Sequence, residues 1–283
     1  MIRVLSDSTC DLSKEVTDRY NIGIIPLNVR LGEEEHRDGV DITMEEIFAW
    51  SDANKMTPKT SAPALADVVS TYEENLKKYD QLIVFTISAS MSSSFEICTL
   101  AAEEAGAADR IKVIDSRNLS TGVGHLAVEA AIMAEEGKSL EAIENRVLEL
   151  RDRVRSSFTV DTLVFLHRGG RCSGLATLLG SALKLHPRIV VENGTMHSDQ
   201  KYRGSLDKVI IKYVRDLTEE LKKAKPDRVF ITHSGCSQVI VESVRALLSE
   251  LKVFKEIIET RTGGVVSAHC GPGTLGVLYI EGR

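Results

Sequence analysis

The sequence predicts an α/β protein of two lobes in which helices cover a parallel sheet. Short β-rich runs alternate with amphipathic helical stretches along the chain, which is typical of a parallel sheet with helical crossovers. The chain has 283 residues, near the size at which one hydrophobic core divides into two. Its composition, with 43% hydrophobic and 27% charged residues, is that of an ordinary soluble protein.

Residues 1–155 form the predicted N-terminal lobe. A first strand at Ile2–Leu5 precedes a helix at Ser13–Tyr20, which a serine cap opens, and a second strand is expected at Ile22–Val29. Thr43 and Glu46 have the spacing of a capping box, which predicts another helix start. The other elements predicted for this lobe are a helix after Pro63, strands at Leu82–Ile87 and Ile111–Ile114, and helices at Phe95–Glu104, 120–137 and 139–155.

Residues 156–283 form the predicted C-terminal lobe, because the long helices give way to strands near residue 155. Ser156–Leu166 is expected to be extended, and Arg188–Glu192 reads as a strand that ends at the turn signal Asn193-Gly194. The elements that follow are helices at 205–224 and 238–251 and strands at Val229–Thr232, Glu256–Thr260 and Leu275–Ile280.

Hydropathy and cysteine usage predict a cytoplasmic protein. No run approaches the ~18 apolar residues that span a bilayer, so stable membrane insertion is not expected. The apolar stretch at the N-terminus is too short for a signal peptide and is followed by Asp7. The sequence contains no CxxC pair, so its cysteines give no indication of a zinc site. Scattered free thiols fit a reducing compartment. The five cysteines are Cys10, Cys98, Cys172, Cys236 and Cys270.

Charge argues against nucleic-acid binding but is unevenly distributed. The net charge of −6 and the isoelectric point near 5.7 do not favour neutralising phosphate backbones. The segment 151–203 is nevertheless basic, with nine Lys or Arg residues against four acids. Such a segment is either a solvated face or a docking surface for an acidic partner or a phosphate.

Two loops rich in small polar residues are candidates for binding in the first third of the chain. Ligands of open α/β sheets bind at the carboxyl ends of strands, and Asp7–Asp11 directly follows the first strand. Its two carboxylates could hold a metal or phosphate, or cap the next helix. Thr60–Pro63 precedes a helix, so its hydroxyls either cap that helix or help its amides to bind an anion.

Two further loops have residues suited to a polar head group. Ser88–Ser94 contains five serines, more than one helix cap requires, and it lies between a strand and a helix. His269–Gly273 places a histidine in a predicted turn, where its glycines permit close backbone approach. Histidine changes charge near neutral pH and can donate to a carboxylate.

Stronger catalytic motifs are absent from the sequence. There is no Walker P-loop, no GxSxG elbow and no HExxH motif. Gly122–Ala127 matches the letters GxGxxA, but it does not directly end a strand. We therefore expect its glycines to let a helix pack closely on the sheet rather than to bind a dinucleotide.

Taken in this order, the four loops resemble the DegV family, whose fatty-acid-binding members are the lipid subunit of bacterial fatty acid kinase. The resemblance covers essentially the whole chain. The serine loop departs from it, since the family usually reads Ser-Gly-Thr-Tyr where this chain has Ser92-Ser93-Ser94-Phe95. The segments that carry the resemblance are Asp7–Leu12, Thr60–Pro63, Ser92–Phe95, Asp115-Ser116, Leu166–Arg171 and His269–Gly273.

The resemblance implies an N-terminal three-layer α/β/α lobe with a parallel sheet and a C-terminal two-layer α/β lobe with a mixed sheet. A fatty acid such as palmitate, stearate or oleate would lie in a tunnel at their junction, without metal or other cofactor. The groups implied to hold its carboxylate are the hydroxyls of Thr60, Ser61 and Ser92, the imidazole of His269, and the serine loop at Ser93.

The implied function is that of a carrier without a catalytic centre of its own. A partner kinase would phosphorylate the presented carboxylate, and Arg171 and Arg203 are candidates to contact that kinase or the phosphate. Two other functions stay open at this point. One is an acyl hydrolase or transferase with Ser92 as nucleophile and His269 as base, and the other is a regulatory module that binds no ligand.

Overall fold

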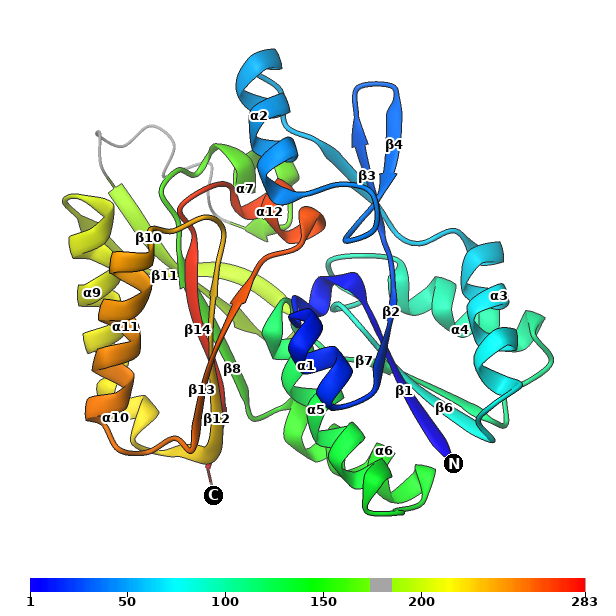
Figure 1. The fold of residues 1–283 in the computed structure, drawn as a ribbon. Coiled ribbons are helices and arrows are strands. Elements are labelled where there is room, and N and C mark those ends of the chain that lie inside the picture. Colours follow the sequence, from blue (N-terminus) through cyan, green and yellow to red (C-terminus); the bar gives the residue numbers. More distant parts are fainter. Residues whose placement is uncertain (174–184, 283) are drawn as a thin grey trace.

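The computed structural model describes residues 1–173 and 185–282 and has a two-domain α/β fold. Figure 1 shows helices α9 (Leu206–Asp216) and α11 (Gln238–Glu250) on one outer side of the molecule. Helices α3 (Leu65–Leu76) and α4 (Ser94–Glu104) lie on the opposite side. Two large sheets lie between these helix pairs, and the second of them contains strands from the second half of the chain.

A four-stranded parallel sheet forms the centre of the N-terminal domain. Its order is β2-β1-β6-β7, and every neighbouring pair is parallel. The continuous apolar run at Leu82–Phe85 is fully buried, as expected for a parallel strand covered on both faces. The strands are β1 (Ile2–Asp7), β2 (Ile22–Ile25), β6 (Gln81–Thr86) and β7 (Ile111–Asp115).

Helices cover both faces of this sheet and produce the predicted three layers. On one face Val68 and Tyr72 of α3 pack in a cluster with Leu82. On the other face Leu126 and Ile143 pack in a cluster with Ile83. The helices of this second face are α1 (Lys14–Arg19), α5 (Thr121–Glu135) and α6 (Leu140–Arg151).

A small antiparallel sheet, which the sequence did not predict, follows β2. The strand expected at Ile22–Val29 is interrupted at Pro26, which has no backbone N–H to donate. Beyond it, β3 (Asn28–Leu31) is the central strand of the order β4-β3-β5. The capping box of Thr43 and Glu46 is confirmed at the start of the next helix. The elements beside β3 are β4 (Glu34–Arg37), α2 (Met44–Asn54) and β5 (Lys59–Ser61).

A seven-stranded mixed sheet forms the C-terminal domain, as predicted. Its order is β13-β12-β14-β8-β10-β11-β9, with parallel pairs at β12–β13 and β11–β9 and antiparallel pairs elsewhere. Helices α9, α10 (Thr218–Leu221) and α11 pack on one face around Tyr213 and Val241. The strands are β8 (Val154–Thr159), β9 (Cys172–Ser173), β10 (Leu185–Glu192), β11 (Thr195–Arg203), β12 (Ala224–His233), β13 (Glu256–Arg261) and β14 (Leu275–Glu281).

Three predictions for the second half need correction. The extended segment expected at Ser156–Leu166 ends at Thr159, and α7 (Val164–Gly169) begins after it. The helix expected at 205–224 is divided at Leu217 into α9 and α10, and residue 224 already belongs to β12. The predicted turn around His269 is instead the last turn of a helix, α12 (Gly264–Cys270).

Helix α5 joins the two domains, because it packs on both large sheets. The imidazole of His125 meets the ring of Phe230 on β12 edge to face, with ring centroids 4.7 Å apart. Glu129 accepts hydrogen bonds from Lys225 at 2.7 Å and Arg228 at 2.6 Å. In the part of the chain that the structure describes, none of the helices is both long and apolar enough to cross a membrane.

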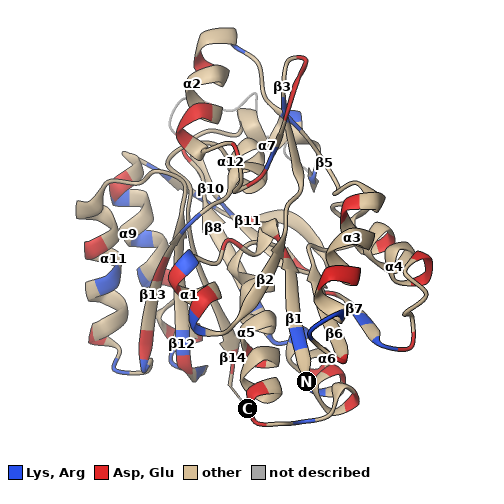
Figure 2. Cartoon of the chain, turned by 45° about the vertical axis from the view of Figure 1, so that its right-hand side comes forward, with Lys and Arg blue, Asp and Glu red and all other residues tan. Residues whose placement is uncertain are grey.

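The basic segment 151–203 does not form one face. Arg151 ends α6, Arg155 lies on β8, Arg188 on β10 and Arg203 at the end of β11, while Lys184 lies outside the described residues. Figure 2 shows Lys and Arg interspersed with Asp and Glu on α9 and α11. Within the basic segment, Arg151, Arg155 and Arg188 line a common cavity, whereas Arg171 and Arg203 lie elsewhere.

Candidate ligand-binding site

A cavity of about 280 Å³ contains six of the seven predicted site residues in its walls. We call it the hydroxyl pocket. Arg203 does not line it and is exposed at the end of β11. The six residues come from β5, the β6–α4 loop, the segment after α7, and α12: Thr60, Ser61, Ser92, Ser93, Arg171 and His269.

A polar contact between two residues that line the hydroxyl pocket joins β5 to α12. Thr60 Oγ1 and His269 Nε2 lie 2.8 Å apart, and the two residues are separated by 209 positions in the sequence. Burial lowers the pKa of His269 to about 4, and the positive charge of Arg171 adds to this shift. The imidazole is therefore neutral at neutral pH. Its other nitrogen, Nδ1, is buried without a hydrogen-bond partner among the described residues.

Helix α7 lies against this imidazole through Gly169. A Cβ atom placed on Gly169 would lie 2.3 Å from His269 Nδ1, closer than real Cβ contacts. Gly170 then ends the helix with a φ of 67°, the left-handed conformation that favours glycine. Gly169 and Gly170 thus have two separate structural roles.

Two buried carboxylates hold the first amides of α12. Gly263 N donates to Asp11 Oδ1 at 2.7 Å, and Gly264 N donates to Asp38 Oδ1 at 2.6 Å. Ser120 Oγ donates to the other oxygen of Asp11 at 2.5 Å, and Ser8 Oγ donates to that of Asp38 at 2.8 Å. Burial raises the pKa of both carboxyl groups. These contacts position the helix that carries His269.

The Asp7–Asp11 loop has a structural role in this arrangement. Asp7 accepts the amide of Ile87 at 2.8 Å, and burial raises the pKa of Asp7 to about 6. Its other oxygen accepts from Thr9. Among residues 1–173 and 185–282, no group of three or more His, Cys, Asp or Glu side chains is arranged to hold a metal ion. The contacts of Asp7 and Asp11 therefore favour the helix-capping and loop-fixing alternative for this motif.

The serine loop divides its hydroxyls between structure and the pocket. Ser88 is buried and donates to the carbonyl of Gly194 at 2.7 Å, which connects the loop to the β10–β11 turn. Ser92 Oγ lies 2.9 Å from Ser94 Oγ and accepts the amide of Ser94 at 3.2 Å. Ser93 is the residue before α4 and is exposed. Ser92 and Ser93 are the two members of the loop that line the hydroxyl pocket.

Arg171 is fixed at the pocket by backbone carbonyls rather than by acidic residues. Its Nη1 donates to Gly169 O at 2.7 Å, and its Nε donates to Met91 O at 3.3 Å. The residue as a whole is exposed. A guanidinium held in this way keeps its charge available to an anion near the pocket.

The rest of the hydroxyl pocket is apolar, which the sequence analysis did not foresee. These side chains are contributed by both domains, and their spacing along the chain gives no common pattern. An alkyl chain could contact them without burying any polar group unpaired. The apolar lining residues are Leu27, Ala62, Ile87, Met91, Leu119, Met196, Val265, Val266 and Cys270.

The geometry does not favour a serine nucleophile. Thr60, rather than Ser92, is the hydroxyl that contacts His269 Nε2, and Ser92 contacts Ser94. Within the described residues no hydrogen bond joins Ser92 to His269, and no carboxylate is bonded to His269 Nδ1. A nucleophile, its base and a group that orients the base are therefore not assembled here.

Comparison with known proteins gives one consistent result. The DegV family model matches residues 1–282. A DegV domain-containing protein from Caldanaerobacter subterraneus subsp. tengcongensis is 30% identical over 282 residues, covering 99% of both chains. The solved structure of a fatty-acid-binding DegV family protein from Thermus thermophilus has a TM-score of 0.89 at 30% identity and 99% coverage of both chains. A stearic acid-binding protein from Eubacterium ventriosum has a TM-score of 0.86 at 28% identity, covering 99% of this chain and 98% of the other.

Proposed function

Because this chain belongs to the DegV family, we propose that it carries one long-chain fatty acid at the junction of its two domains. The carboxylate lies among the hydroxyls of Thr60, Ser61, Ser92 and Ser93 and the imidazole of His269. The alkyl chain lies along the apolar lining. The observation that carries this proposal is a single pocket with hydroxyls and a neutral imidazole in one part of its wall and aliphatic side chains in the rest.

The similar proteins support this ligand class. The Thermus thermophilus protein binds a fatty acid, and the Eubacterium ventriosum protein binds stearic acid. Each buried methylene contributes ~0.8 kcal/mol, so a chain of about sixteen carbons contributes on the order of 10 kcal/mol before ordering costs. Since the tail supplies most of the affinity, the head group needs only hydrogen bonds that satisfy and orient it.

The head-group residues suit a carboxylate that must stay accessible. Thr60 and Ser92 can donate hydroxyl hydrogens, and His269 can donate from either ring nitrogen in the matching tautomer. An anion at this position favours the protonated imidazole, so binding raises the pKa of His269 above its ligand-free value of about 4. Proton uptake therefore accompanies fatty acid binding at pH values between the ligand-free and the ligand-bound pKa of His269.

The second part of the proposal is that the bound carboxylate is presented to a fatty acid kinase, which forms an acyl phosphate. Arg171 is exposed beside the pocket, where its guanidinium can meet the added phosphate. Arg203 is exposed on the same domain and is proposed to contact the kinase. The chain itself contributes no catalytic residue to this reaction. The domain boundary proposed near residue 155 lies within β8, and the ligand lies between the two parts.

Native mass spectrometry of the purified protein, followed by organic extraction, tests the ligand. We expect one fatty acid per chain, and thermal stabilisation by added stearate or oleate once the protein has been delipidated. A protein that purifies bare and is not stabilised by either fatty acid would contradict the carrier function and favour a regulatory module.

Kinase coupling is tested separately with a bacterial fatty acid kinase catalytic protein and the lipid-loaded chain. Arg171→Ala and Arg203→Ala are each expected to slow acyl phosphate formation at least tenfold, with fatty acid affinity retained. Arg215→Ala, on the exposed face of α9, is the matched control. Unchanged rates in both variants would remove these arginines from the proposal.

A further inference from the structure

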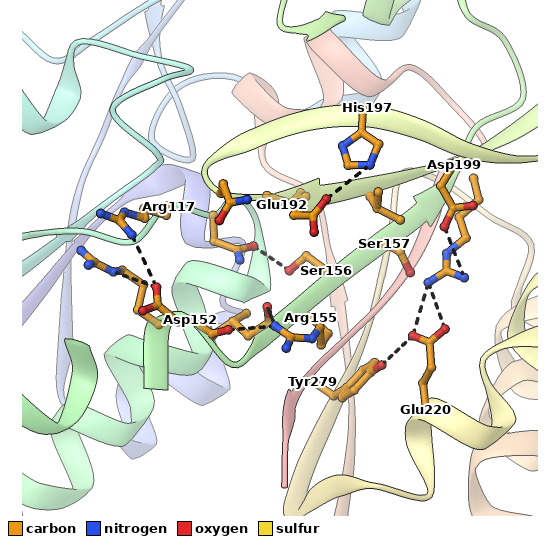
Figure 3. Close-up of a pocket in the computed structure, with 17 residues that line it drawn as sticks. Arg117, Asp152, Arg155, Ser156, Ser157, Glu192, His197, Asp199, Glu220 and Tyr279 are labelled. Carbon is orange, nitrogen blue, oxygen red and sulfur yellow. Dashed lines mark hydrogen bonds and ion pairs between the residues drawn. The ribbon is translucent and has the colours of Figure 1, made fainter. Parts of the chain in front are cut away.

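A second cavity, of about 630 Å³, has more than twice the volume of the hydroxyl pocket and shares no lining residue with it. It lies where β8 and β10 meet the β7–α5 loop and the end of α6. Figure 3 shows Arg117, Asp152 and Arg155 on one side and Asp199, Glu220 and Tyr279 on the other. We call it the arginine cavity, because each of these segments contributes one arginine: Arg117, Arg151, Arg155 and Arg188.

The fixed charges of the arginine cavity are positive. The side chains of Arg151 and Arg188 are only 16% and 12% exposed. Four acidic residues equal the four arginines in number, but their side chains are more open to water than these two arginines, with exposures of 66% at Asp152, 69% at Glu192, 48% at Glu220 and 38% at Asp199. Exposed carboxylates are screened and can turn into solvent, whereas buried guanidinium groups cannot. The buried positive charges of these two arginines therefore favour the binding of an anion in the cavity.

The two buried arginines have unused hydrogen-bond donors. The Nε atoms of Arg151 and Arg188 are buried, and neither has a hydrogen-bond partner among the described residues. The ion pairs of both arginines are long: Nε of Arg151 lies 3.7 Å from Asp152, and the guanidinium of Arg188 lies 3.4 Å from Glu220 and 3.8 Å from Asp199. Charge-assisted hydrogen bonds are typically about 2.7–2.9 Å long. A buried donor without a partner is unfavourable, and more so when it is charged, so an acceptor from a ligand would be stabilising.

The backbone fixes the position of a third arginine in this cavity. Arg117 has a φ of 49°, the left-handed conformation that non-glycine residues rarely adopt. Asp115 Oδ1 accepts the amide of Arg117 at 2.9 Å and stabilises this turn. The guanidinium of Arg117 then lies 3.6 Å from Asp152, the same carboxylate that Arg151 approaches. Two arginines thus share one exposed acid, which leaves an excess of positive charge at this end.

We propose that the arginine cavity binds a phosphorylated small molecule, with its phosphate at Arg117 and Arg151. Phosphate has enough acceptor oxygens to bond two guanidinium groups at once. The carboxylate of Asp152, which both arginines approach, has only two oxygens to share between them. The few aliphatic lining residues, Val154, Val190 and Val191, do not form a surface for a lipid tail. The cavity has the volume usual for small-molecule sites. This site goes beyond the fatty acid function and does not depend on it.

Isothermal titration with inorganic pyrophosphate and with AMP, at constant ionic strength, tests the site. We expect saturable binding of one equivalent of each to the full chain. Arg151→Met and Arg117→Met should each weaken it at least tenfold, and Arg151→Lys should restore only part of it, because lysine keeps the charge but not the planar fork. Arg215→Met, outside both cavities, should bind as the unchanged chain does.

Citrate serves as the carboxylate control, and we expect it to bind at least tenfold more weakly than pyrophosphate. The proposal is overturned if neither phosphate compound binds saturably or if citrate binds as tightly as pyrophosphate. It is also overturned if a folded Arg117→Met protein binds pyrophosphate with unchanged affinity. Arg117 is half-exposed, so its variant keeps the test valid even when Arg151→Met does not fold. A His269→Gln protein should bind pyrophosphate normally, which separates a failure here from a failure of the fatty acid function.

Discussion

Gly169 at the end of α7 lies so close to His269 on α12 that a methyl group on Gly169 would lie 2.3 Å from the imidazole Nδ1. Gly169→Ala should therefore displace the imidazole. We expect fatty acid affinity to fall about tenfold and unfolding free energy to fall by about 1–3 kcal/mol. Fluorescent fatty acid displacement and urea unfolding measure the two effects. Gly137→Ala, where an added methyl meets nothing within 4 Å, should leave fatty acid affinity unchanged.

The hydroxyl of Thr60 should matter through its contact with His269 at 2.8 Å. Thr60→Val keeps the shape of the side chain but removes the hydrogen bond, so we expect fatty acid affinity to fall five- to tenfold, or about 1 kcal/mol. Thr60→Ser should retain most of the affinity. Titration of delipidated protein with oleate distinguishes these outcomes, and equal affinities for the valine and serine variants would contradict a polar role.

The low pKa of His269 should make the folded protein less stable as the pH decreases below about 6.5. The pKa of His269 is about 4 in the folded, ligand-free chain, compared with its ordinary value near 6.5. As the pH falls below 6.5, the unfolded chain takes up the proton first, so the stability present at neutral pH is progressively lost toward pH 4. At pH 5 this residue alone should lower the unfolding free energy by about 2 kcal/mol relative to pH 7.5. Urea unfolding of delipidated wild type and His269→Gln at both pH values measures this contribution. The change in unfolding free energy between the two pH values should differ between the two proteins by about 2 kcal/mol, because Asp7 and His125 titrate in both.

The anchoring of α12 by Asp38 predicts a local effect. Asp38→Ala leaves the buried amide of Gly264 and the hydroxyl of Ser8 without their acceptor, so we expect a loss of about 2–4 kcal/mol of unfolding free energy. Hydrogen exchange in Gly264–Cys270 should become faster. Asp52→Ala on the exposed surface of α2 is the control. Unchanged exchange in α12 would show that other contacts hold the helix.

Local patterns predicted many of the elements but missed several around the pocket, among them β5, α7, α12 and β11. The capping box at Thr43 and the buried run at Leu82–Phe85 are short-range signals and were read correctly. Helix α12 begins at Gly264, directly after Gly263, which is a poor start for a helix. The carboxylates that stabilise this start lie 252 and 226 positions away in the sequence. Strand β11 has a polar sequence without a strand pattern, and its position depends on pairing with β10 and β9.

The candidate site was predicted through resemblance rather than through geometry. Six residues named in this way line one pocket, while Arg203 lies elsewhere. Neither Gly169 nor Asp38 could be assigned a role from sequence, because each acts by touching a residue distant along the chain. The arginine cavity has no sequence motif at all, since its arginines come from separate elements.

The contact between Thr60 and His269 has a consequence for how the chain folds during its synthesis. Because the two residues are 209 positions apart, the pocket cannot close until the ribosome has released most of the chain and α12 has docked on Asp11 and Asp38. A nascent chain that has folded only its first domain has no complete pocket in which to bind a lipid. Ligand binding is therefore expected late in maturation. A chain that holds a ligand is one in which α12 has been synthesised and the two domains have packed together.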